Sequence, residues 1–138
     1  MGTRSTVAFY SEWDKSEDAK PIVNIYQQFD GYITGVGHEL ANFLKEFTVI
    51  NGIGMGQDEM GKYANGMNCL AAQFIRQFKE RVGGLYLAYP DEREGYHYDV
   101  RLNKEGNLTV TIGSYHESID GKTFTPEELL ELTDDHEE

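Results

Sequence analysis

Residues 68–82 read NCLAAQFIRQFKERV, and this stretch decides the fold because only one side of it is apolar. Its apolar side chains recur at helical spacing, and they are Leu70, Ala71, Phe74, Ile75, Phe78 and Val82. Such a stripe predicts an amphipathic helix that starts near Asn68 and buries one face against another layer of the protein. Gly83 and Gly84 follow, and they are expected to end the helix.

Strand patterns lie on both sides of this helix. After it, residues 85–89, 96–102 and 108–112 are apolar or alternate between apolar and polar positions, and a turn joins the last two as a hairpin. Before it, residues 6–11 and 22–29 show the same signal and predict a second hairpin. Asp30 and Gly31 end that hairpin's second strand as a turn.

A second helix is expected before residues 68–82. Thr34 is predicted to cap it, and its apolar stripe consists of Val36, Leu40, Phe43, Leu44 and Phe47. The glycine-rich residues 51–67 are expected to form a surface loop. Near the end of the chain, Thr125-Pro126-Glu127-Glu128 is a capping box that predicts a short helix through Leu132.

The order of these elements is ββ-α-α-βββ-α, which keeps the strands in groups apart from the helices. That grouping is typical of α+β proteins. We therefore expect one α+β domain over residues 1–133, with an antiparallel sheet of about five strands packed against two main helices. Residues 134–138 are expected to form an acidic, disordered tail.

The charge of the chain limits its partners. It carries 24 acidic and 12 basic residues, for a net charge of −12. Direct binding to nucleic acid or to an anionic membrane depends on Lys and Arg side chains, so neither is expected. One cysteine allows no internal disulfide, and no apolar stretch is long enough for a membrane span. A cytoplasmic protein is expected.

The first candidate site is a polar ligand site. If the first two strands pair, Arg4 is brought beside Asp30 and Tyr32, near a glycine-flanked helix start of the kind that accepts anions. Asn68, Gln73 and Arg76 on the later helix are expected to complete this site. A purely structural role for the Arg4 and Asp30 pair is the alternative.

The second candidate site is catalytic. Cys69 lies in the first turn of the predicted helix, where the helix dipole favours a thiolate. His97 is its candidate partner, and Asp99 lies on the same face of the same predicted strand. The alternative, which we favour, is a small half-buried cysteine with no catalytic role. The four histidines show no metal-ligand spacing, so no metal and no cofactor are expected.

Three separated motifs carry a resemblance. They are MGTRS (residues 1–5), YQQFDGY (26–32) and NGMNCLAAQF (65–74), all within residues 1–102. Together they resemble a family of short, uncharacterised proteins scattered through bacteria and their phages. The resemblance supplies no activity. It implies that the Arg4 cluster and the Asn68 cluster form one shared feature. For a chain from a phage or bacterium, we expect an accessory or counter-defence role.

The sequence favours a non-enzymatic binding protein for a small polar or anionic, nucleotide-like ligand. In a phage, such a protein would sequester a defence signal. One alternative is a cysteine-dependent hydrolase that uses Cys69 and His97. The other is an acidic interaction module that engages a basic protein partner, or a nucleic-acid mimic.

Overall fold

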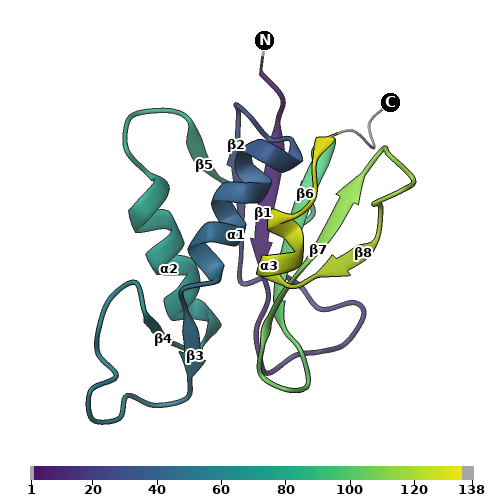
Figure 1. Ribbon diagram of the computed structural model, residues 1–138. Coiled ribbons are helices and arrows are strands. Elements are labelled where there is room, and N and C mark those ends of the chain that lie inside the picture. The colour runs from purple at the N-terminus through teal and green to yellow at the C-terminus, as the bar shows by residue number, and fades with distance from the viewer. Residues whose placement is uncertain (1, 135–138) are drawn as a thin grey trace.

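A sheet of six strands, in the order β5-β2-β1-β6-β7-β8, lies behind three short α-helices (Figure 1). The computed structural model describes residues 2–134. The strands of this sheet are β1 Ser5–Phe9, β2 Val23–Gln27, β5 Leu85–Ala88, β6 Tyr96–Leu102, β7 Leu108–Ser114 and β8 Lys122–Phe124. A second, parallel sheet joins β3 Thr48–Ile50 to β4 Tyr63–Asn65. The helical segments are η1 Ile33–Gly37, α1 His38–Leu44, α2 Gly66–Phe78 and α3 Pro126–Leu130.

The core lies between the helices and one face of the large sheet. Phe74 of α2 lies at its centre. The centroid of its ring is 5.4 Å from that of Phe9 in β1 and 5.4 Å from that of Phe43 in α1. Val7, Phe9, Tyr98 and Val100 are fully buried on this face of β1 and β6. The strand periodicity therefore sends the intervening side chains of β1 and β6 to the opposite face, which we call the back face.

The α+β class is confirmed, and one pairing departs from the expected antiparallel sheet. β1 pairs with β2 in antiparallel register, as predicted, but it pairs with β6 in parallel register. The central position of β1 in the six-stranded order makes this possible, because the two predicted hairpins join side by side through β1 and β6. Neighbouring hairpins can join in either orientation, and the sequence holds no local signal for that choice.

Several element boundaries differ from the sequence predictions. β8 was not predicted, and the expected surface loop over residues 51–67 contains β4 and the start of α2. α2 ends at Phe78, so Val82 is fully exposed and not part of the apolar stripe. Gly66 has a positive φ of 83°. It begins the helix two residues earlier than predicted.

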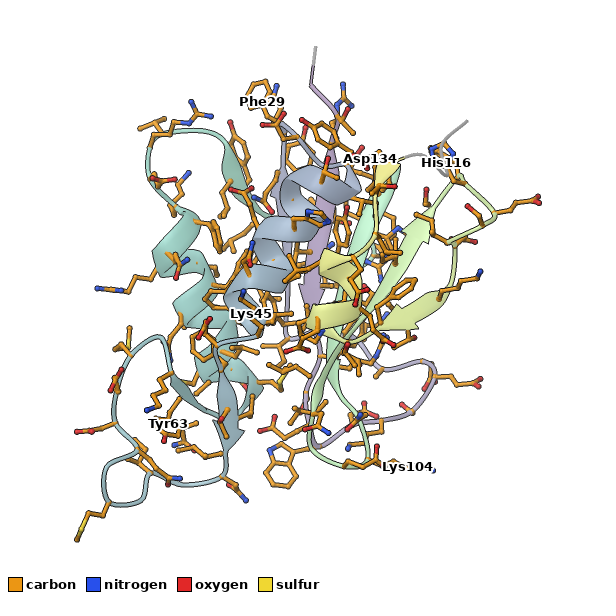
Figure 2. The ribbon with its side chains drawn as sticks, in the orientation of Figure 1. Phe29, Lys45, Tyr63, Lys104, His116 and Asp134 are labelled. Carbon is orange, nitrogen blue, oxygen red and sulfur yellow. The ribbon has the colours of Figure 1, made fainter. Side chains whose placement is uncertain are left out.

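The predicted cap at Thr34 is wrong. Tyr32 precedes the first helical turn, and its side chain makes no capping hydrogen bond. Asp134 supplies the carboxylate instead: it accepts a hydrogen bond from the Ile33 backbone N–H at 3.0 Å and another from the Thr34 hydroxyl. Figure 2 shows Asp134 close to this turn. Asp134 is thus part of the fold and not of a disordered tail, and residues 135–138 lie outside the described residues.

Asp134→Ala should therefore destabilise the protein. The substitution removes the acceptor of the Ile33 N–H, which has the role of a side-chain cap, so we expect the free energy of unfolding to fall by about 1 kcal/mol. Urea denaturation measures the change. Glu131→Ala, which removes an exposed carboxylate from the same segment, is the control. Equal effects of the two substitutions would show that Asp134 does not hold this turn.

Candidate functional site

A cavity of about 440 Å³ opens where the end of α2 meets the end of β2 and the first turn of α1. The backbone turns that shape it depend on special residues: Asp30 has a positive φ of 59°, and Gly83 and Gly84 have positive φ values of 84° and 78°. Phe29 marks its position in Figure 2. We call this the acidic cavity, and it is lined by Gln27, Phe29, Asp30, Glu39, Phe78, Glu80, Arg81, Gly83, Gly84 and Leu85.

The charge of the acidic cavity is negative. Its lining contains three carboxylates, Asp30, Glu39 and Glu80, against the single guanidinium of Arg81. Partial burial raises the pKa of the Glu39 carboxyl above its ordinary value, and the negative charges of Asp30 and Glu80 raise it further. The negative electrostatic potentials of the three carboxylates therefore add up in the cavity, and they favour a positively charged group there.

Two further features of the cavity suit a positively charged nitrogen group. The Gln27 side-chain oxygen is buried, and it has no hydrogen-bond partner in the part of the chain that the structure describes. The rings of Phe29 and Phe78 also line the cavity, and the Arg81 guanidinium lies over the Phe29 ring at 5.9 Å. Carboxylates and aromatic faces are the groups that bind ammonium and guanidinium ions.

The predicted Arg4 cluster is only partly assembled. The first hairpin does bring the N-terminus beside the turn, because the Gly31 N–H donates to the Thr3 carbonyl at 2.9 Å. Arg4 is exposed, however, and no ion pair joins it to Asp30 within residues 2–134. Asp30 accepts a hydrogen bond from the Tyr32 hydroxyl at 3.1 Å. Of this cluster, only Asp30 lines the acidic cavity.

The residues of the Asn68 cluster are spread along α2, with Asn68 near its start and Arg76 in its last turn, and none of them lines the acidic cavity. Figure 2 places Tyr63, which leads into the start of this helix, far from Phe29 at the other end of the molecule. Gln73 has a structural role there: its amide donates to the Tyr63 carbonyl at 2.9 Å and accepts from the Gly61 N–H at 2.8 Å. Asn68 and Arg76 are exposed. The structure therefore does not bring the two predicted clusters together.

Cys69 and His97 are separated by the sheet. α2 packs on the face of β1 that carries Phe9, whereas His97 alternates with the buried Tyr96 and Tyr98 and lies on the back face. Cys69 is half-buried and lines a small cavity of about 140 Å³, where the Gln73 amide lies 3.6 Å from its sulfur. The geometry supports the non-catalytic interpretation of this cysteine.

His97 and Asp99 are neighbours on the back face. Burial lowers the pKa of His97, and Asp99 opposes this effect. Asp99 itself lies 3.8 Å from the Arg93 guanidinium and 3.9 Å from that of Arg101. The sequence correctly placed His97 and Asp99 on one face of a strand. It did not predict that Arg93, from the loop before β6, would lie beside Asp99.

No family model matches this chain, and neither the curated proteins nor the solved structures contain a significant match. Within residues 2–134, no three His, Cys, Asp or Glu side chains are grouped so that they could hold a metal ion. In the same part of the chain, the helices are all too short or too polar to cross a membrane.

Sequence reasoning missed most of the acidic cavity. Asp30 was predicted only as a turn residue, and Glu80 is one of the polar positions within the predicted helix of residues 68–82. Gln27 gave no signal, because its side chain reaches the cavity only through the pairing of β2 with β5. Glu39 gave none either, because a glutamate in the first turn of a helix is an ordinary solvated residue.

Proposed function

We propose that this chain is a non-enzymatic binding protein whose acidic cavity receives a cationic group, the ammonium or guanidinium of a basic partner. The observation that carries the proposal is the convergence of Asp30, Glu39 and Glu80 on one cavity, whose lining also includes the Phe29 and Phe78 residues. The local charge opposes the anionic ligand expected from the sequence, since phosphate or carboxylate oxygens would meet like charges.

Protonation of Glu39 should be linked to binding. The carboxyl has a raised pKa because burial and its acidic neighbours disfavour the ionised form. A bound cation favours that ionised form, so it lowers the Glu39 pKa and releases a proton. Affinity for a cation should therefore increase as the pH rises through the Glu39 pKa, and it should level off above it. NMR titration of the Glu39 carboxyl carbon, with and without the cation, measures this shift.

Binding can be tested with small cations of known structure. Titration of the ¹⁵N-labelled protein with argininamide or cadaverine should give saturable shifts of the amide signals of Asp30, Glu39 and Glu80. Glu39→Gln combined with Glu80→Gln should weaken binding at least about tenfold, because each substitution removes one attractive charge. Glu46→Gln, which neutralises an exposed carboxylate after α1, is the matched control and should have no effect.

Two results would count against the proposal. Saturable binding of inorganic phosphate or a nucleoside monophosphate at the same amides, without binding of the cations, would restore the anionic ligand. Equal binding of the cations by the Glu39→Gln, Glu80→Gln variant would show that these two carboxylates do not bind them. A lysine-rich peptide provides a further comparison: tighter binding than cadaverine would favour a basic protein partner over a small molecule.

A further inference from the structure

The back face of the large sheet carries a compact polar group. The strand register sets Thr6 of β1 beside His97 of β6, and it sets Ala8 of β1 between Asn24 of β2 and Asp99 of β6. Thr6, Ala8 and Asn24 are fully or almost fully buried. Polar side chains on the open face of an antiparallel hairpin are ordinarily solvated, so their burial needs a cover.

The cover is the connection from β5 to β6, residues 89–95, which we call the strap. The Asn24 amide nitrogen donates to the carbonyls of Tyr89 and Glu92, each at 2.8 Å. Arg93 fastens the other part of the strap, because its guanidinium donates to the Tyr10 hydroxyl at 2.9 Å and lies 3.8 Å from Asp99. β5 and β6 run in the same direction, so this short connection must cross the back face.

The side chains beneath the strap keep unused hydrogen-bonding capacity. The Thr6 hydroxyl oxygen, the Asn24 side-chain oxygen and Oδ1 of Asp99 are buried, and they have no hydrogen-bond partner among residues 2–134, although Oδ1 of Asp99 lies 3.8 Å from the Arg93 guanidinium. A buried polar atom that stays unpaired destabilises the fold, so such atoms in folded proteins almost always have a partner.

We propose that this back-face site, formed by Thr6, Asn24 and Asp99 around Ala8 and closed by the strap, binds a small neutral molecule that donates hydrogen bonds. Two of its three oxygens can only accept, and the Thr6 hydroxyl can accept or donate. Ala8, which lies between Asn24 and Asp99 in the strand register, has only a methyl group as its side chain. Water is the smallest molecule that meets these requirements, and a primary amide is a larger one with two N–H donors.

The charges around the site argue for a neutral occupant. The Asp99 carboxylate is already paired with two guanidiniums, that of Arg93 at 3.8 Å and that of Arg101 at 3.9 Å. A cation would have to enter beside both of them. An anion would have to displace the same guanidiniums from Asp99. The back-face site therefore differs in kind from the acidic cavity, and neither proposal depends on the other.

The occupant can be observed directly by NMR. Long-lived bound water transfers magnetisation to nearby protons, so we expect cross-peaks at the water frequency to the Ala8 methyl group and the Thr6 amide. Absence of these cross-peaks would exclude water. A titration then shows whether a primary amide can take the place of water. Acetamide should shift the Ala8 methyl signal in a saturable way if amides enter, whereas N,N-dimethylacetamide, which has no N–H donor, should not. Neither cross-peaks nor an acetamide shift would overturn the proposal.

A substitution at Thr6 gives an independent test whose sign is decisive. Thr6→Val keeps the shape of the side chain and removes the hydroxyl. If the hydroxyl binds an occupant, the unfolding equilibrium constant should rise on the order of tenfold. If the hydroxyl is unpaired in a dry interior, the constant should fall, and the proposal is wrong. Thr111→Val is the matched control, since the Thr111 hydroxyl already pairs with that of Thr123 at 2.8 Å on the same face.

Discussion

Phe74→Ala should lower the free energy of unfolding by about 3–5 kcal/mol, the range found when a large core aromatic residue is truncated. The Phe74 ring is almost fully buried, and it contacts Phe9, Phe43 and Phe78 with centroid distances of 5.4, 5.4 and 4.7 Å. These partners come from β1, α1 and α2, so the cavity left by the substitution would lie where three elements meet and could not close by the movement of one side chain.

Guanidinium denaturation, with a check that the slope against denaturant stays constant, measures this loss. Val82→Ala is the control, because the sequence places Val82 on the same apolar stripe as Phe74 but the structure leaves it fully exposed. The control should change the free energy of unfolding by less than about 0.5 kcal/mol. Similar losses at the two positions would mean that α2 continues to Val82 and packs differently on the sheet.

Gly35→Ala should be the second most disruptive substitution. A Cβ atom at Gly35 would lie 2.1 Å from the Asp30 carbonyl oxygen, which is far inside contact distance. This carbonyl accepts a hydrogen bond from the Val36 N–H at 2.7 Å, which holds it in place. Because the clash is with backbone and not with a flexible side chain, we expect a loss of about 3 kcal/mol, the upper part of the range for overpacking.

Gly54→Ala is the matched control for this prediction. A Cβ atom at Gly54 would approach only the end of the Gln57 side chain, at 2.6 Å, and that side chain can rotate away. We expect a loss below about 1 kcal/mol there. Gly35→Ala should also displace Asp30 and weaken cation binding in the acidic cavity. A variant of normal stability that binds argininamide normally would show that the turn tolerates a side chain.

The sequence determined most of the local elements of this protein, although β3, β4 and β8 were not predicted. The helical stripe from Leu70 to Phe78 predicted α2 as an amphipathic helix, and the strict alternation of residues 96–102 predicted β6 with its correct bounds. The capping box at Thr125 is present, with the Glu128 N–H bonded to the Thr125 hydroxyl at 3.1 Å and the Thr125 N–H to the Glu128 carboxylate at 2.8 Å. These signals succeed because each depends on residues within one or two turns of each other.

The tertiary structure alone decided which of these elements meet, and with them the candidate sites. Asp134 holds a turn 100 residues earlier in the chain, although the charge pattern of its neighbourhood is that of a solvated tail. Glu39, Glu80 and Asp30 share a cavity only because α1 and α2 pack on the same sheet face. Cys69 and His97 are separated only because they lie on opposite faces of that sheet. Charge and hydrogen-bond partners act through space, so a linear pattern predicts a residue's element but not its neighbours.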